Sequence, residues 1–150
     1  MIREADIDDS GPISRMVSDL AEKFINSDFT EEGRDHLLDP MTPAAIAKYI
    51  RSGYRYHVAE DEDEIVGIVG IRENRHLYHL FVAESHQGRG LAKALWKKAM
   101  DASLRRGNPG EFTVKSSLQA HAVYEHLNYV TLSKPVINQG VTYTTMKVEM

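Results

Sequence analysis

The chain has 150 residues, no cysteine and a formal net charge of −4. This length suits a single domain spanning residues 1–150, and the lack of cysteine excludes disulfides, a thiol nucleophile and a thiolate metal site. The acidic balance disfavours a nucleic-acid-binding protein, which usually carries surplus basic charge. No basic segment followed by an apolar one opens the chain, and no apolar run approaches 18 residues. We therefore expect a cytoplasmic, soluble protein without nucleic-acid or membrane partners.

A strand beginning near Met1 and one helix are expected first. Ser10 is a suitable N-cap, because its hydroxyl can accept a backbone hydrogen bond at a helix start. The following apolar residues recur at helical spacing and define one buried face: Ile13, Met16, Val17, Leu20, Ala21 and Phe24.

The segment 28–40 is polar and is predicted to be a loop. Thr42-Pro43 then starts a second short helix, which Gly53 stops. Strands over 54–60 and 64–72 are expected to form a hairpin closed over residues 61–63.

The second half of the chain begins with a strand over 76–82, followed by a helix that continues to about Arg106. Its expected buried stripe is Ala92, Leu95, Trp96 and Ala99. A strand over 111–115, a helix over 118–127 and a last strand over 141–148 complete the chain. The order β-α-α-β-β-β-α-β-α-β-β predicts an α/β fold (an α+β mixed sheet) with helices on both faces.

The turn before the long helix carries the most informative motif. Its residues are Gln87, Gly88, Arg89, Gly90, Leu91 and Ala92. Glycine allows a tight turn and close approach of a ligand, because no Cβ stands in the way. The first N–H groups of the helix lack partners, and the positive end of the helix dipole adds to them. A strand, a glycine turn and a helix start therefore predict a pyrophosphate-binding site.

Two familiar phosphate motifs do not fit this turn. Lys93 stands where the dinucleotide fingerprint needs its third glycine, and the chain has no Gly-Lys-Ser/Thr triplet. The remaining pattern, Gln-x-x-Gly-x-Ala, resembles the acyl-CoA pyrophosphate loop of the GNAT N-acetyltransferases. This resemblance implies an acyl-CoA N-acyltransferase-like fold and acetyl-CoA as co-substrate, with no metal.

Both flanks of the turn extend the resemblance. Upstream, residues 79–84 resemble the family's fourth strand and the loop after it. Downstream, residues 117–129 resemble the family segment Asn-x-x-Ala-x-x-x-Tyr-x-x-x-Gly-Phe, and Ala120 and Tyr124 match it. Ser117 replaces the family's Asn and can still cap a helix, with shorter reach. Asn128 replaces Gly and is the best non-glycine residue for a positive φ.

The resemblance implies a set of cofactor-binding residues and a proton donor. The cofactor-binding residues are Leu80, Phe81, Val82, Gln87, Gly88, Arg89, Gly90, Leu91, Ala92, Ser117 and Tyr124. Tyr124 is placed beside the cofactor sulfur, where a phenol with a pKa of about 10 suits protonation of a thiolate. The alternative is that Tyr124 is an ordinary packing residue of an amphipathic helix.

The general base is less sharply indicated. Family members often carry a carboxylate eleven residues before the loop Gln, and that position is His76 here. Imidazole titrates near neutral pH and could accept a proton. Glu73, His79 and a chain of waters are the alternatives. Strand alternation predicts that His76 and His79 face opposite ways, which also argues against a metal site between them.

The function implied is an N-acetyltransferase that moves an acetyl group from acetyl-CoA to a primary amine by direct transfer in a ternary complex. The acceptor would be a small-molecule or peptide amine, and the resemblance leaves a homodimer open. The acidic segment 22–39 would favour a cationic amine if it borders the acceptor site, although a solvated acidic loop is the more common explanation of such a segment. The alternative function is a non-catalytic acyl-CoA-binding module or sensor.

Overall fold

The computed structural model describes residues 1–23, 30–118, 120–138 and 141–150. The helices are α1 (Ser10–Glu22), α2 (Glu31–Leu38), α3 (Pro43–Arg51), α4 (Leu91–Arg105) and α5 (His121–His126). The strands are β1 (Ile2–Glu4), β2 (Arg55–Asp61), β3 (Glu64–Arg72), β4 (His76–Val82), β5 (Glu111–Ser117), β6 (Val130–Thr131), β7 (Val136–Asn138) and β8 (Val141–Glu149). Short 3-10 turns span Ile7–Asp9, Asp39–Met41 and Glu84–His86.

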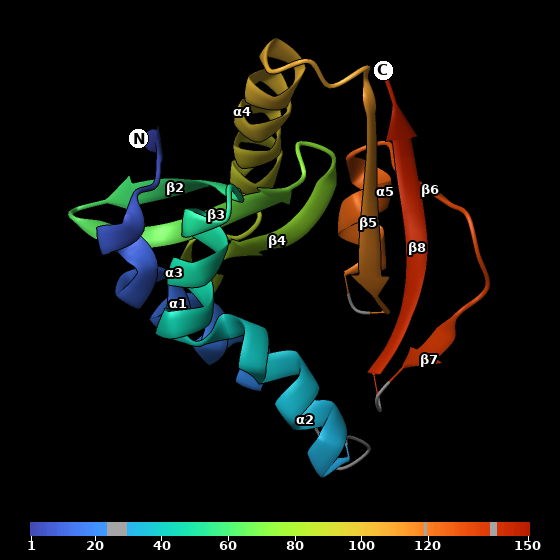
Figure 1. The fold of residues 1–150 in the computed structure, drawn as a ribbon, viewed down its shortest axis with the longest axis horizontal. Helices are drawn as coiled ribbons and strands as arrows, with labels where there is room; N and C mark the ends of the chain where they lie inside the picture. Colours follow the sequence, from blue (N-terminus) through green and yellow to red (C-terminus); the bar gives the residue numbers. More distant parts are fainter. Residues whose placement is uncertain (24–29, 119, 139–140) are drawn as a thin grey trace.

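The strands form one mixed sheet in the order β1-β2-β3-β4-β5-β8-β6, with β7 also paired to β8. Every described strand pair is antiparallel except β4 with β5. Figure 1 shows that the strands before α4 and those after it form two parts of the sheet that diverge from this parallel pair. The predicted mixed α/β fold class is therefore confirmed.

Each face of the sheet has its own apolar core. On one face, α4 and α5 pack on the sheet around Leu95, Trp96 and Phe112. The rings of Trp96 and Phe112 pack edge to face, with their centroids 5.0 Å apart. On the other face, α1 and α3 bury Ile13 and Ile46. Each fully buried side chain of this size stabilises the fold by roughly 1.5–3 kcal/mol. The apolar stripes read from helical periodicity are the surfaces that cover the sheet.

The segment predicted as a loop over 28–40 is mostly helical, so that prediction was wrong. Thr30 caps α2 by accepting the backbone N–H of Gly33 at 2.9 Å, and two glutamates occupy the first turn. Acidic side chains there are favoured by the helix dipole. Helix α2 has little apolar periodicity, so the pattern of apolar residues did not predict it. Residues 28 and 29 of the predicted loop lie outside the described residues.

The starts of two helices and the number of strands after the last helix also differ from expectation. Ser10 is not an N-cap, because α1 continues from a 3-10 turn that Asp6 caps, and the Ser10 hydroxyl donates to the carbonyl of Ile7 at 2.7 Å. The helix expected over 118–127 begins only at His121, and three strands rather than two follow it. Phe24, expected on the apolar face of the first helix, lies outside the described residues.

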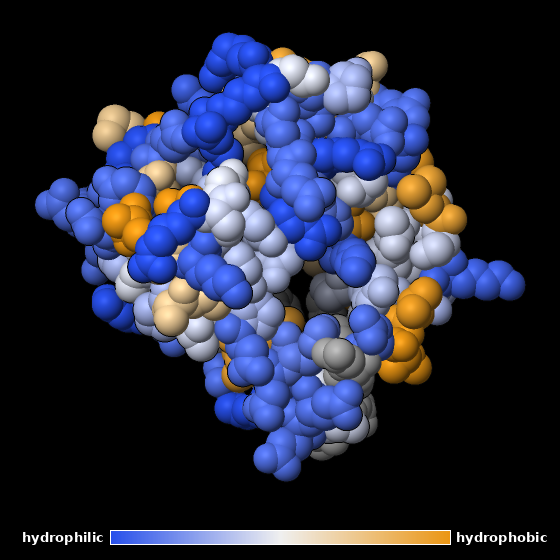
Figure 2. Space-filling model, in the orientation of Figure 1, coloured by the Kyte–Doolittle hydropathy of each residue, from blue (hydrophilic) through white to orange (hydrophobic). Residues whose placement is uncertain are grey.

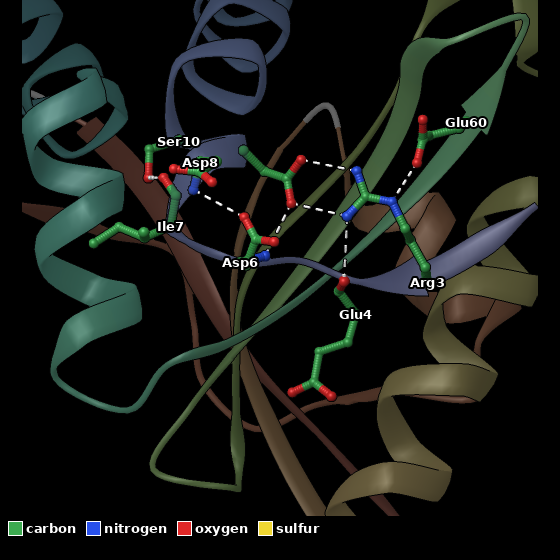
Figure 3. A network of polar contacts seen from close by, with 8 residues as sticks. Arg3, Glu4, Asp6, Ile7, Asp8, Ser10 and Glu60 are labelled. Carbon is green, nitrogen blue, oxygen red and sulfur yellow. Dashed lines mark hydrogen bonds and ion pairs between the residues drawn. The ribbon is translucent and has the colours of Figure 1, made fainter.

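An arginine near the N-terminus joins β1, β2 and the start of α1 (Figure 3). Arg3 donates to the two carboxylate oxygens of Asp9 at 2.8 and 2.9 Å, and also to Glu60. The same Asp9 carboxylate accepts the backbone N–H of Asp6 at 2.9 Å. The hydrogen bonds from Arg3 lower the pKa of Asp9 from its usual value. This network therefore fixes the edge of the sheet to the first helix.

Replacing Asp9 by Asn should lower the free energy of unfolding at pH 7 by about 1–3 kcal/mol, because charge-assisted hydrogen bonds to Arg3 are lost. The folded-state pKa of Asp9 is lowered, so its contribution is present above the unfolded pKa of about 3.9 and is lost as pH falls through the folded pKa. Urea unfolding should therefore show the two proteins converging below about pH 4. Asp8→Asn, at an exposed neighbour, is the control. Equal loss in both variants would contradict this role.

Candidate functional site

The glycine turn between β4 and α4 leaves a helix start open to a ligand. Gly88 and Gly90 have φ angles of +77° and +78°, in the left-handed region that other residues adopt only at a cost. A Cβ at either position would meet no atom within 4 Å, so the approach to the backbone is unobstructed. Gly90 is the N-cap of α4 and offers no side chain to its first N–H groups. These observations fit a pyrophosphate at this turn.

The loop before the glycine turn is held by side-chain contacts. Gln87 donates from Nε2 to the carbonyl oxygen of Val82 at 2.9 Å. His86 Nε2 lies 2.7 Å from Oδ2 of Asp61, the last residue of β2. Gln87 therefore fixes the turn against the end of β4.

Strands β4 and β5 separate soon after they meet. Their pairing joins His76 to Thr113 and Leu77 to Val114, and from Tyr78 onward β4 pairs only with β3 among the described residues. Figure 2 shows the surface hollowed between the two parts of the sheet. The β5-facing edge of β4 thus presents backbone N–H and C=O groups without a strand partner, which an extended ligand could bind.

A β-bulge lies where the two strands part. Across β3 and β4, Gly70 pairs with His79 and Ile71 with Leu77, so Tyr78 is an extra residue with no opposite partner. Such a bulge resets the alternation of side chains along the strand. Residues on either side of Tyr78 therefore no longer follow a simple period of two.

The bulge places His76 and His79 on the same face, so the prediction of opposite faces was wrong. His76 Nδ1 lies 2.8 Å from Thr113 Oγ1, and Thr113 alternates with β5 residues that are buried on the α4 face. His76 is thus on the α1 and α3 face. His79 reaches that same face, where its Nδ1 lies 2.9 Å from the Tyr56 hydroxyl.

The remaining predicted β4 residues divide between the faces. Leu80 and Val82 are half-buried against the α4 core, whereas Phe81 packs with the α1 and α3 core. On α4, Leu91 and Ala92 are half-buried and Arg89 precedes them as an exposed residue. Ala92 was expected to be buried and is only partly covered.

Tyr124 belongs to α5, and its side chain lies in the apolar core on the α4 face of the sheet. Its side chain is 8% exposed and meets Tyr129 edge to face at 5.7 Å. Burial raises the pKa of Tyr124 to about 12, so the phenol stays protonated at neutral pH. Ser117 is not the N-cap of α5, which is Ala120, but its Oγ accepts the N–H of Ala120 at 3.2 Å in the turn before the helix. The expected positive φ at Asn128 is confirmed, at +71°.

The candidate bases are both electrically neutral at pH 7. Burial, and then the positive charges of Arg72 and Lys115, lower the pKa of His76 to about 4. Burial alone lowers the pKa of His79 to about 4, and His79 is the more deeply buried of the two. Glu73 lies exposed in the turn between β3 and β4 with φ +54°. His76 is thus the more accessible imidazole.

Other features of the described residues lie away from this site. Two surface hollows of about 380 Å³ occur beside α4 and β1 and beside β6 and β8, without the glycine turn or Tyr124 among their lining residues. Within the described ranges, no group of three or more His, Asp or Glu side chains could hold a metal ion. No helix in the same ranges is long and apolar enough to cross a membrane.

The comparisons with known proteins agree with this geometry. A family model described as "Acetyltransferase (GNAT) domain" matches residues 25–150. The human N-acetyltransferase 8 is 32% identical over 88 residues, which cover 51% of this chain and 39% of that protein. The chain thus corresponds to well under two thirds of this relative's length.

Solved structures show a similar fold over the whole chain. A GCN5-related N-acetyltransferase from Rhodopseudomonas palustris superposes with a TM-score of 0.84 at 21% identity, covering 100% of this chain and 95% of that one. The yncA protein of Salmonella typhimurium, solved with acetyl-CoA, superposes with a TM-score of 0.70 at 19% identity. The match covers 99% of this chain and 92% of that one.

The likeness to these structures shows that the chain has the acyl-CoA N-acyltransferase class of fold. The chain belongs to the GNAT acetyltransferase family, whose domain is that of an acyl-CoA-dependent acetyltransferase.

Gly90→Glu should abolish acetyl-CoA binding, because it adds bulk and negative charge where the pyrophosphate would lie. Acetyl-CoA at millimolar concentration should raise the melting temperature of the wild-type protein and leave that of the variant unchanged. Gly107→Glu is a matched control, since Gly107 also has a positive φ, +97°, with open space around it, but follows the far end of α4. An equal acetyl-CoA shift in both variants would contradict the assigned site.

Proposed function

We propose that this chain transfers the acetyl group of acetyl-CoA directly to a primary amine, with both substrates bound together. The observation that carries the proposal is the open N-terminus of α4 beside the unpaired edge of β4. Membership of the GNAT family and the acetyl-CoA bound to one structural neighbour support acetyl transfer in general. The ternary complex and the amine acceptor are our proposal.

The cofactor would run from the glycine turn along β4. We assign the pyrophosphate to the backbone of Gly88, Gly90 and the first turn of α4, including Leu91 and Ala92. Arg89 adds an exposed positive charge at the same turn. When bound, acetyl-CoA would supply the acetyl group as a reactive thioester.

The strand edge would position the rest of the cofactor. The backbone of Leu80 and the N–H of Val82 would offer hydrogen bonds to an extended chain, as an added strand would receive, whereas the backbone of Phe81 faces β3. Gln87 contributes by holding the carbonyl of Val82, and Ser117 by ordering the start of α5.

Tyr124 would hold a proton for the departing sulfur. Because burial raises its pKa to about 12, its hydroxyl is a hydrogen-bond donor throughout the neutral range. Complete proton transfer is less favourable than from an ordinary phenol, so donation of a hydrogen bond is the larger part of its proposed role.

His76 would accept the proton of the incoming amine, directly or through water. It is neutral at pH 7 and lies near the point where β4 and β5 separate. Its low pKa makes it a weak base, so the acceptor must reach the site with its amine largely deprotonated or pass its proton on to solvent.

The remaining assignments are also proposals. We take residues 1–150 as one GNAT domain acting in the cytoplasm on a small-molecule or peptide amine, without a metal, nucleic acid or membrane partner. A homodimer is compatible with this function. The competing function, an acyl-CoA-binding module without turnover, differs in requiring no proton donor at Tyr124.

Tyr124→Phe should lower turnover about 10²-fold, the typical contribution of a positioned acid or base, because only the hydroxyl is removed. Steady-state rates and acetyl-CoA thermal shifts measure turnover and binding separately, and binding should be retained. Tyr129→Phe is the control, because the Tyr129 hydroxyl is buried without a partner among the described residues and its removal should leave turnover intact.

Full turnover in Tyr124→Phe, with the chemical step rate-limiting, would show that solvent protonates the thiolate. Intact acetyl-CoA binding without turnover of any amine in the wild-type protein would instead favour the binding module.

The pH dependence tests His76. If its neutral imidazole is required, kcat/KM should rise with pH through a value near 4, because the pKa of His76 is about 4. The variant His76→Gln should lower the rate by roughly 10²-fold and remove that acidic limb. An unchanged rate in His76→Gln would assign the proton to water, and a limb near pH 6.5 would assign it to a different histidine.

A further inference from the structure

Arg72, at the end of β3, is a half-buried cation without a counter-ion among the residues that the structure describes. Its Nε is buried and has no hydrogen-bond partner, and its guanidinium forms no ion pair within the described residues. The guanidinium carbon instead lies 5.8 Å from the centre of the Tyr78 ring. Burying part of a charge without a carboxylate costs free energy, so an arginine in this state is prepared for an anionic ligand.

Arg72 lies on the face of the sheet where the proposed acceptor would approach. It pairs across the strands with His76, and paired residues of antiparallel strands share a face. Tyr124 belongs to the core on the opposite face. Arg72 and Tyr124 thus lie on opposite faces of the sheet, with the opening between β4 and β5 between them.

A second cation lies on the same face of the sheet as Arg72, but on β5, across the opening from β4. Lys115 lies two residues after Thr113 on β5, so both side chains are on the face of His76. Lys115 is exposed and lies 5.2 Å above the Tyr143 ring, with no ion pair in the described part of the chain. Arg75, by contrast, has a counter-ion, because its guanidinium Nη2 lies 2.6 Å from Oε1 of Glu111. Arg72 and Lys115 therefore leave this face with uncompensated positive charge.

The aromatic residues around Arg72 hold it in place. Tyr78, the bulged residue, meets Tyr49 and Tyr54 edge to face at 5.2 and 5.4 Å. Tyr49 and Tyr54 stack on each other at 4.7 Å. This packed group limits the motion of the Tyr78 ring on which the guanidinium rests. Preorganisation of this kind reduces the cost of binding a planar carboxylate.

We propose that Arg72 binds a carboxylate of the acceptor, so that the substrates are amines that also carry a carboxylate, such as α-amino acids. This inference rests on the acetyltransferase function proposed above and names its acceptor class. It differs from the expectation that acidic residues of segment 22–39 select a cationic amine. Part of that segment is α2, and its Arg34 already pairs with Glu22 at 3.0 Å.

The test compares free α-amino acids with their α-carboxamides, which keep the amine and lose the carboxylate. The ratio of kcat/KM for acid over amide is measured in each protein, which cancels the intrinsic reactivity of the two amines. Arg72→Gln should lower this ratio about 10-fold or more, as expected for a charge-assisted hydrogen bond. Arg72→Lys should retain part of it, because the charge remains without the bidentate geometry. Arg75→Gln removes one positive charge nearby and should leave the ratio unchanged.

An acid-to-amide ratio that stays the same in Arg72→Gln, or falls equally in Arg75→Gln, overturns the inference. Faster acetylation of polyamines than of any amino acid overturns it as well. A wild-type protein with no acetyl-CoA thermal shift would overturn the proposed acetyltransferase instead. In that case calorimetric binding of N-acetylphenylalanine against N-acetylphenylalaninamide decides the carboxylate site: tighter binding of the acid that Arg72→Gln removes supports it, and equal binding refutes it.

Discussion

The arrangement of this site depends on the short parallel contact between β4 and β5. Two residue pairs join the strands, and the bulge at Tyr78 follows directly. Had the pairing continued, the backbone of β4 would be satisfied by β5, and no groove would separate the two parts of the sheet. The same bulge brings His76 and His79 together on the face that also carries Arg72, opposite Tyr124. One local irregularity at the start of the opening therefore sets which β4 residues lie on either face of the sheet.

Close packing of α4 fixes the other end of the groove. A Cβ on Gly67 of β3 would lie 2.8 Å from Leu95 and 3.3 Å from Leu91, so the helix rests directly on the strand backbone there. This contact holds the first turn of α4 beside the end of β4. The phosphate-binding backbone and the unpaired strand edge consequently keep a fixed relation, to which the hydrogen bond from Gln87 to the Val82 carbonyl also contributes.

Much of the fold could be predicted from the sequence, because apolar periodicity reports burial directly. The apolar face of α1, the hairpin and the glycine turn followed from that signal and from turn residues. Helix α2 was missed because its stability comes from Thr30 and first-turn acids rather than from an apolar face. On β4 itself no glycine or other marker stands at the Tyr78 bulge, so the shared face of His76 and His79 could not be foreseen. Arg72 likewise differs from other surface arginines only in its tertiary surroundings, namely a buried Nε for which the described part of the chain supplies no hydrogen-bond partner.

Hydrogen–deuterium exchange with and without acetyl-CoA tests the central claim most directly. The claim is that the backbone at the start of α4 and along the open edge of β4 binds the cofactor. Acetyl-CoA should slow exchange of the amides of residues 90–93 and of alternate amides in 78–82, while α3 and β1 stay unchanged. Protection confined to other regions, or equal protection throughout the chain, would contradict this account of the site.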